Sequence, residues 1–321
     1  MRFPARGSGR WIRRHWLEMT LLVGLVGILA WYAVAAYGLI PKEMLAPRAR
    51  GTSQFSGDSA YRYVRDQVAF GPRPTGSDAN RRTGEFVIQE LKKAGWTVEV
   101  QEFTYKGVPG RNIVGKAGAG PVAIVGAHYD TRRQADNDPD PARRGEPVMG
   151  ANDGASGAAV LLELARSLSK AKLTNEVHLV FFDAEDNGRL DGWDFIAGSR
   201  YMAAHLNAKP EFVIVLDMIG DADQQIYKER NSTPALQDRI WALAGQLGYG
   251  QSFIPQYKWA MLDDHTPFIE KGIPAADLID FDYPYWHTTQ DLADKVAPSS
   301  LERVGRVMQK FLEENPAGGR Q

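Results

Sequence analysis

Three nearly all-apolar runs in the middle of the chain constrain its fold more than any other feature. They are PVAIVGAHYD, EVHLVFFDAED and EFVIVLDMIG, at residues 121–130, 176–186 and 211–220. Each has the length of one strand, and the lack of polar alternation is typical of strands buried on both faces. Segments with helical periodicity separate the runs. This alternation predicts an α/β domain with helices on both faces of a central sheet.

The remaining segments extend the same pattern. Three more strands are predicted at GWTVEVQEF, NIVGK and IPAADLIDF, residues 95–103, 112–116 and 273–281. Helical spacing or composition predicts helices at residues 58–70, 79–94, 154–168, 199–206, 234–248 and 301–314. Between the first two helices, GPRPTGS is a turn-rich loop.

The first forty residues read as a membrane anchor. Residues 19–40, MTLLVGLVGILAWYAVAAYGLI, are 22 residues without a charge, long enough to cross a hydrocarbon core of about 30 Å. Five arginines precede the run, so the positive-inside rule places residues 1–18 in the cytoplasm and the rest outside it. We expect a transmembrane signal anchor at 19–40, a linker at 41–57 and a catalytic domain at 58–321. The alternative is a cleaved signal peptide, because Ala33-Val34-Ala35 resembles a cleavage site.

Charge and composition exclude some classes of function. The chain has a formal net charge of −1, and setting aside the five arginines and one acid of residues 1–40 leaves −5 on residues 41–321. A mildly acidic body argues against nucleic acid as a partner. The sequence has no cysteine, so thiolate nucleophiles and cysteine metal sites are excluded.

Titratable residues stand where the apolar runs end. The first run ends in His128 and Asp130, the second in Asp183, Glu185 and Asp186, and the third in Asp217. Asp153 lies in a glycine-rich turn that opens a helix, and His287 lies in the aromatic stretch YPYWHTTQD. Each residue alone has an ordinary explanation as a cap, a turn or a solvated acid. Because ligand sites in such sheets gather at the carboxyl ends of the strands, we expect these residues to converge.

Histidine and carboxylate without cysteine form a ligand set that suits zinc. Zinc in such a site activates water or acts as a Lewis acid, and a carboxylate that is not a ligand can serve as the general base. The adjacent pair Glu185 and Asp186 fits this division, with one residue on the metal and the other on the reacting proton. His287 is predicted to be a ligand on a loop whose aromatic residues wall the site. His178 is expected to fill a sheet face, His205 to lie on a helix surface, and His265 either to line the site or to make a buried structural contact.

Seven segments, in order, resemble a known superfamily. They are GAHYD, GANDGASGAAVLLELAR, FFDAED, GSRYMA, VLDMIG, DDHTPFIEKGIPA and YWHTTQD. Their order resembles that of the zinc aminopeptidases of the bacterial leucyl aminopeptidase type and of their relatives, the animal-type glutaminyl cyclases. The resemblance spans about residues 58–315 and implies a three-layer αβα sandwich with a mixed, mostly parallel central sheet.

The resemblance also implies roles for individual residues. It implies one metal position held by His128, Asp153 and Asp217, and another held by Asp153, Asp186 and His287, for one or two zinc ions in all. Glu185 and Asp264 would be catalytic, with Glu185 as the general base; Asp130 would orient His128, and Trp286 and Asp263 would lie in the substrate pocket. Two positions depart from the family pattern: Asp186 replaces the usual glutamate, and Asp277 stands where animal cyclases have a histidine.

Three functions follow from the resemblance. The first is a membrane-anchored glutaminyl-peptide cyclotransferase that converts an N-terminal glutamine to pyroglutamate with release of ammonia, which LDDHTPF and Trp286 favour. The second is an aminopeptidase that hydrolyses the first peptide bond. The third is a non-catalytic binding module, which the intact ligand positions disfavour. Peptide or protein N-termini are the expected substrates of both enzymes.

Overall fold

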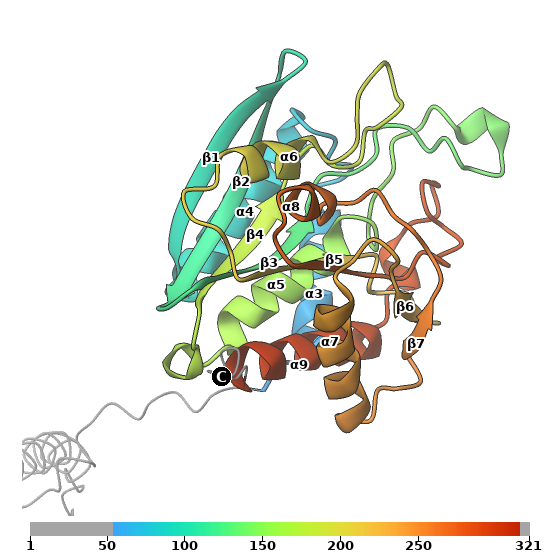
Figure 1. Ribbon diagram of the computed structural model, residues 1–321. Helices are drawn as coiled ribbons and strands as arrows, with labels where there is room; N and C mark the ends of the chain where they lie inside the picture. The colour runs from blue at the N-terminus through green and yellow to red at the C-terminus, as the bar shows by residue number, and fades with distance from the viewer. Residues whose placement is uncertain (1–53, 315–321) are drawn as a thin grey trace, which may run out of the picture. The chain divides into compact units, whose positions relative to one another are not determined.

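A computed structural model describes residues 54–314, and Figure 1 shows the arrangement of their elements. The predicted cytoplasmic segment and membrane anchor, residues 1–40, lie outside this part of the chain. Within residues 54–314, no helix combines the length and apolar character that a membrane span requires.

A six-stranded mixed sheet forms the centre of the described part. Its strand order is β1-β2-β4-β3-β5-β8. The strands are β1 Thr97–Tyr105, β2 Val108–Gly118, β3 Val122–His128, β4 Glu176–Phe182, β5 Phe212–Asp217 and β8 Ala275–Ile279. β4, β3, β5 and β8 run parallel to one another, whereas β2 pairs antiparallel with β4, and β1 pairs antiparallel with β2 at the edge of the sheet. All six strands were predicted from the sequence, and the mixed, mostly parallel sheet is confirmed.

Helices cover both faces of this sheet. The helices are α3 Gly57–Val68, α4 Asp78–Lys93, α5 Ala155–Ser167, α6 Ala197–Ala204, α7 Pro234–Gln246, α8 Thr266–Glu270 and α9 Pro298–Glu314. α3, α5 and α9 pack on one another, and α4 and α5 contact the sheet on the same side. α6 and α8 pack with residues of the opposite sheet face, such as Ile124 and Val213. Residues of the parallel strands alternate between these two cores, which is why their sequences are apolar throughout.

Short elements escaped the sequence analysis. β6 Ile226–Lys228 and β7 Phe253–Tyr257 form a second, two-stranded parallel sheet, and α8 is only five residues long. Elements of three to five residues are too short to show a hydrophobic periodicity. In β7, Pro255 also disfavours the prediction of a strand, because proline is rare inside strands.

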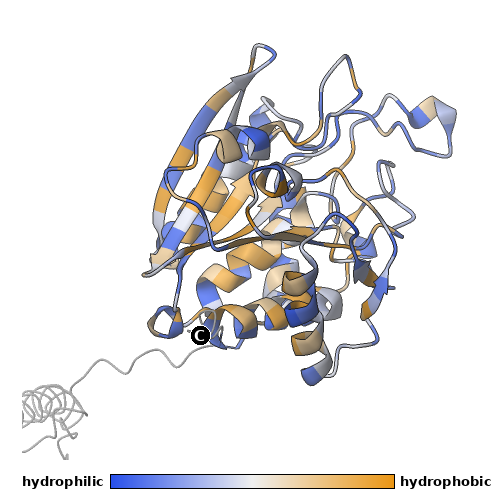
Figure 2. Cartoon of the chain, viewed as in Figure 1, coloured by the Kyte–Doolittle hydropathy of each residue, from blue (hydrophilic) through white to orange (hydrophobic). Residues whose placement is uncertain are grey.

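Helix α5 connects the fold to the residues at the sheet edge. It is buried along nearly its whole length, and Figure 2 shows it as a hydrophobic element beside the hydrophobic central strands. Small residues fill its first turns, so its backbone approaches the sheet closely. A Cβ atom on Gly157 would lie 2.1 Å from the carbonyl oxygen of Leu216 and 2.8 Å from the Ala127 Cβ. This contact places the N-terminus of α5 against the ends of β3 and β5.

The close approach of α5 to the sheet predicts that a glycine-to-alanine change in this helix lowers the free energy of unfolding, although such a change usually raises it. In an open helix the change stabilises a protein by up to about 1 kcal/mol. We expect Gly157→Ala to destabilise this protein by about 1–3 kcal/mol instead, because neither the strand backbone nor the buried Ala127 can move away. The matched control is Gly245→Ala in α7, where nothing lies within 4 Å of the added Cβ. Urea unfolding of both variants measures the difference, and equal free energies of unfolding would contradict the packing argument.

Candidate active site and metal centre

The parallel strands end at one edge of the sheet and deliver the predicted residues there. β3 ends at His128 and β5 at Asp217, while β4 leads into Glu185 and Asp186. Asp153 stands just before α5, and His287 lies in the loop that follows β8. Two histidines and several acids therefore converge at this edge, as the sequence predicted.

Two groups of buried side chains could each hold a metal ion. In the first group, His128 Nε2 lies 3.0 Å from Asp153 Oδ1 and 3.2 Å from Asp217 Oδ1. In the second, His287 Nε2 lies 2.8 Å from Asp186 Oδ1 and 3.7 Å from Asp153 Oδ2. Asp153 belongs to both groups and offers one oxygen to each. The shorter side chain of Asp186 still reaches its histidine.

These residues fit zinc. Imidazole nitrogen and carboxylate oxygen are its ordinary ligands when no thiolate is present. Asp153 Oδ2 and Asp186 Oδ2 are buried and receive no hydrogen bond from any residue in the described part of the chain. A buried carboxylate oxygen without a donor is costly, and a bound cation would satisfy both oxygens.

The pKa shifts of the acids show how crowded the site is. Burial, followed by the charge of Asp153, raises the pKa of Asp186 to about 6. Burial and the nearby Asp263 raise the pKa of Asp217 to about 8. The pKa of Asp153 is lowered although burial opposes this, because His128 donates a hydrogen bond to its carboxylate. The cluster thus carries more negative charge than its surroundings neutralise, which favours a divalent cation.

Asp130 holds the turn that carries Glu185 and Asp186. Its carboxylate accepts hydrogen bonds from the backbone N–H groups of Glu185 at 3.1 Å and Asp186 at 3.2 Å. It also lies 3.6 Å from His128 Nδ1, on the far side of the ring from the ligand nitrogen. This separation is longer than a hydrogen bond, and Nδ1 has no hydrogen-bond partner in the described part of the chain. The role that the resemblance implies for Asp130, orienting the His128 ring, therefore stays a prediction.

Glu185 and Asp186 point to different places although they are adjacent. Asp186 belongs to a ligand group, whereas Glu185 does not. Glu185 lines the cavity beside the ligands and is 7% exposed. Burial raises the pKa of Glu185 well above its ordinary value; His128 opposes the shift, and the neighbouring acids strengthen it. An acid with a raised pKa beside a metal group has the properties of a general base.

Three supporting residues were missed in the sequence. Asp291 accepts hydrogen bonds from the N–H groups of Asn152 and Asp153 and from the Tyr283 hydroxyl. The buried Arg73 donates to the carbonyl oxygens of Tyr129, Met149 and Gly150, so it ties the end of β3 to the turn before α5. Both residues stand in quoted motifs, GPRPTGS and YWHTTQD, but these long-range contacts leave no local pattern.

The third missed residue is Asp136. Its Oδ1 lies 3.6 Å from His287 Nδ1, and Arg132 holds its carboxylate with two hydrogen bonds of 2.7 Å. Each ligand histidine therefore has a carboxylate behind it, Asp130 for His128 and Asp136 for His287. The Trp286 ring stacks on His287 with centroids 3.9 Å apart, so this imidazole is held from two sides.

A cavity of about 390 Å³ opens over the two ligand groups. The acids that line it are Asp153, Glu185, Asp186, Asp217 and Asp263. The aromatic residues that line it include Trp259, Phe281 and Trp286, whose rings form a chain of edge contacts with centroids 5.5 and 4.8 Å apart. Asp263 and Trp286 thus lie where a substrate pocket was expected. Asp264 is 1% exposed and is not among the lining residues, so its catalytic role stays a prediction.

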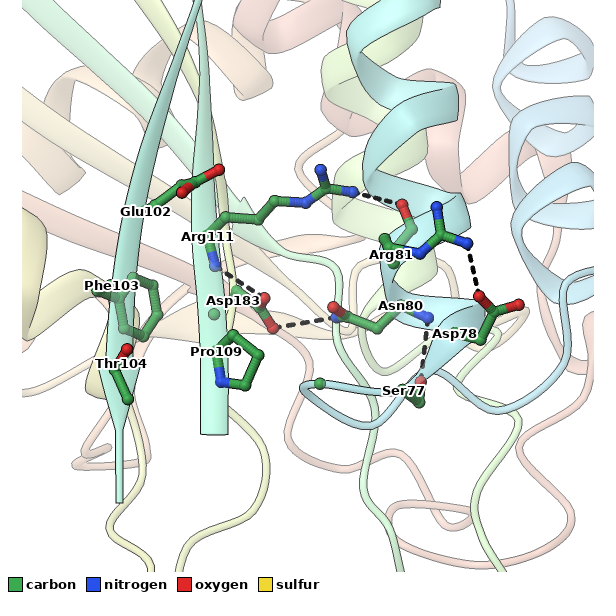
Figure 3. Close-up of a pocket in the computed structure, with 12 residues that line it drawn as sticks. Ser77, Asp78, Asn80, Arg81, Glu102, Phe103, Thr104, Pro109, Arg111 and Asp183 are labelled. Atoms are coloured by element: carbon green, nitrogen blue, oxygen red, sulfur yellow. Dashed lines mark hydrogen bonds and ion pairs between the residues drawn. The ribbon is translucent and has the colours of Figure 1, made fainter. Parts of the chain in front are cut away.

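Asp183 does not join the metal groups. It is buried below a separate cavity of about 590 Å³ between α4 and the β1–β2 hairpin, as Figure 3 shows. Its carboxylate accepts hydrogen bonds from Asn80 Nδ2, the N–H groups of Arg111 and Ala184, and the Tyr129 hydroxyl. Burial and Asp130 raise its pKa to about 7. With four donors satisfied, Asp183 supports the turn after β4 and leaves nothing free for a ligand.

The remaining histidines of the described residues lie away from the ligand groups. His265 is fully buried, with Nε2 3.3 Å from Glu229 Oε2 and Nδ1 3.9 Å from Asp277 Oδ2, so it makes a structural contact. His178 is partly buried in β4, 2.9 Å from Glu176, and His205 is exposed at the end of α6.

Known proteins share this arrangement. The model of peptidase family M28 matches residues 112–312. A glutaminyl-peptide cyclotransferase of Drosophila melanogaster is 26% identical over 313 residues, covering 84% of each chain. The structure of Tannerella forsythia glutaminyl cyclase is 35% identical, with a TM-score of 0.75, over 81% of this chain and 99% of that one. A zinc-dependent exopeptidase from Parabacteroides distasonis is 33% identical, with a TM-score of 0.76, over 82% and 99% of the two chains. Because the family model spans well over half of the chain and every residue of both ligand groups, this protein belongs to peptidase family M28.

Proposed function

We propose that this protein is a zinc-dependent glutaminyl-peptide cyclotransferase, which converts N-terminal glutamine to pyroglutamate. The observation that carries the proposal is the cavity itself. Its lining brings together Glu185, the acids and the histidine of the ligand group Asp153, Asp186 and His287, and aromatic residues that include Trp286. The cyclotransferase names of the Drosophila and Tannerella relatives support the same reaction.

The protein's own residues account for the reaction's proton transfers. The α-amine nitrogen attacks the γ-carbonyl carbon of the same glutamine, so a ring C–N bond forms and the bond to the side-chain nitrogen breaks. Glu185 takes the proton that the α-amine loses and gives it to the departing nitrogen, which leaves as ammonia. Zinc, when held by Asp153, Asp186 and His287, supplies Lewis-acid polarisation of the carbonyl group. The wall around Trp286 keeps the side chain folded back on its own amine and excludes water.

The arrangement of ligand and base predicts opposite outcomes for two buried residues. His287→Ala should lose zinc and activity while the fold survives, because the sheet core is built from other residues. Glu185→Gln keeps the size of the side chain but cannot accept a proton, so zinc content should survive and turnover should fall by about 10²–10⁴-fold. Metal analysis of the purified variants, together with turnover, checks both. Loss of zinc in Glu185→Gln would make Glu185 the ligand, and full activity in His287→Ala would remove the metal role.

A second candidate function is aminopeptidase activity. Both ligand groups are complete, including His128 and Asp217, and a pair of metal positions is common in hydrolytic enzymes. In this reaction Glu185 would deprotonate a water molecule that attacks the first peptide bond. The zinc-dependent exopeptidase from Parabacteroides distasonis supports this candidate.

The masses of the products separate the two reactions. We expect the zinc-loaded protein to remove one ammonia from a Gln-Xaa peptide and to leave a Leu-Xaa peptide intact. Peptide hydrolysis would instead release free leucine from the second peptide and free glutamine from the first. That result would assign the protein to the aminopeptidases.

We also propose that residues 19–40 anchor the enzyme in a membrane, with residues 1–18 in the cytoplasm and the catalytic domain on the other side. The support is the 22-residue uncharged run and the five arginines before it. A fusion after Gln321 to a reporter that is active only outside the cytoplasm should be active. Activity of a cytoplasm-only reporter at the same position would overturn this orientation.

A further inference from the structure

One arginine breaks the charge pattern of the catalytic cavity. Five of the lining residues are acids, and Arg189 is the one lysine or arginine that lines the cavity in the described part of the chain. Its side chain is exposed, and residues 54–314 offer it no ion-pair partner. By contrast, the nearby Arg133 pairs with Asp191 at 3.2 Å and Arg132 with Asp136 at 2.7 Å.

The backbone around Arg189 is held firmly at the cavity wall. Its own N–H donates to the Trp193 carbonyl oxygen at 2.8 Å. Arg132 donates to the carbonyl oxygen of Gly188 on one side, and Arg133 donates to that of Leu190 on the other. The Phe195 ring packs directly on Gly188 and lies 6.0 Å from the Arg189 guanidinium. The backbone of Arg189 is therefore held at the cavity wall, and its exposed side chain carries the charge from there.

The size of the cavity determines which part of a peptide meets this charge. A volume of about 390 Å³ is near the lower end of the roughly 300–1,000 Å³ of small-ligand pockets. With the N-terminal residue at the metal groups, we expect only about two more residues to lie within it, at about 3.4 Å of extended chain each. The acids serve the metal and the N-terminal amine, so Arg189 is left to meet an anion farther along the peptide.

We propose that Arg189 is a specificity-determining residue that selects substrates with a carboxylate close behind the N-terminal glutamine. The carboxylate is either an acidic side chain at the second or third residue or the C-terminal carboxylate of a short peptide. A guanidinium meets either one with two parallel hydrogen bonds. This inference rests on the proposed function for its N-terminal glutamine, but the selection itself does not depend on which bond reacts.

Peptides that differ only in one charge test the proposal. The pairs are Gln-Glu-Ala-amide against Gln-Gln-Ala-amide, Gln-Ala-Glu-amide against Gln-Ala-Gln-amide, and Gln-Ala as free acid against its amide. We expect kcat/KM to favour the charged member of at least one pair by about 2- to 5-fold, the range of an exposed ion pair. The preference should lie mainly in KM and should weaken in 0.5 M salt. The pair that responds identifies the source of the carboxylate.

Variants of Arg189 show whether this residue is responsible. In Arg189→Ala the ratio of kcat/KM within the responding pair should fall to about 1. In Arg189→Glu the ratio should fall below 1, so that the neutral member of the pair becomes preferred. Arg65→Ala is the matched control, because it removes the same charge from the exposed face of α3 and should keep the wild-type ratio. Each variant should keep the zinc content and the thermal unfolding midpoint of the wild type, which shows that it is folded.

The outcomes separate this proposal from the reaction type. A ratio near 1 in every pair for the wild type, or a preserved ratio in both Arg189 variants, overturns the role of Arg189 even if glutamine is cyclised. Release of free glutamine in place of ammonia overturns the proposed cyclisation. The same ratios, measured on glutamine release, then still decide the role of Arg189.

Discussion

Buried carboxylates crowd the C-terminal edge of the central sheet, and the rest of the structure is arranged around their mutual repulsion. Asp153, Asp186, Asp217, Glu185 and Asp263 line one cavity, and burial raises the pKa of several of them. A cluster of this kind is unfavourable unless cations neutralise it. Two histidines within hydrogen-bond distance of the acids reduce the cost, and two buried oxygens without donors remain for a metal. The repulsion between the buried carboxylates is therefore also the reason that the site suits zinc.

Keeping these acids in place requires support from distant parts of the chain. Asp130 binds the backbone of the turn after β4, and Asp291 binds the backbone of the turn before α5. Arg73 connects that second turn to the end of β3 through carbonyl oxygens. These contacts use backbone groups, so they fix the directions of Asp153 and Asp186 without adding charge at the ligand atoms. Preorganisation of this kind spares the site the cost of ordering its ligands when a metal or substrate binds.

The residues that line the cavity fall into three groups with different tasks. The acids form one group of lining residues, the chain of Trp259, Phe281 and Trp286 forms a second, and Arg189 lies on the loop that follows Glu185. The first group serves metal binding and proton transfer, and the second group shapes the pocket for the bound residue. The arginine contributes a charge that neither of these tasks needs, which is why it bears on the choice of substrate.

Much of this protein could be predicted from local sequence patterns. Apolar runs of strand length, separated by helical periodicity, predicted all six strands of the main sheet and its helices except α8, because burial on both faces leaves a pattern in consecutive residues. The rule that parallel strands end at one edge predicted that His128 and Asp217 converge, and the donor types predicted His287 as a further ligand on its aromatic loop. The ordered motifs then divided these residues between two metal positions. Tertiary structure alone decided where the acids after β4 point. Ala184, at φ 60°, turns the chain so that Asp183 faces a separate cavity, Glu185 faces the catalytic cavity and Asp186 faces His287. It also decided the partners of Arg73, Asp136 and Asp291, and it placed Arg189 at the cavity without an ion-pair partner among residues 54–314. Contacts between residues far apart in the chain depend on how the elements pack, and no local pattern records them.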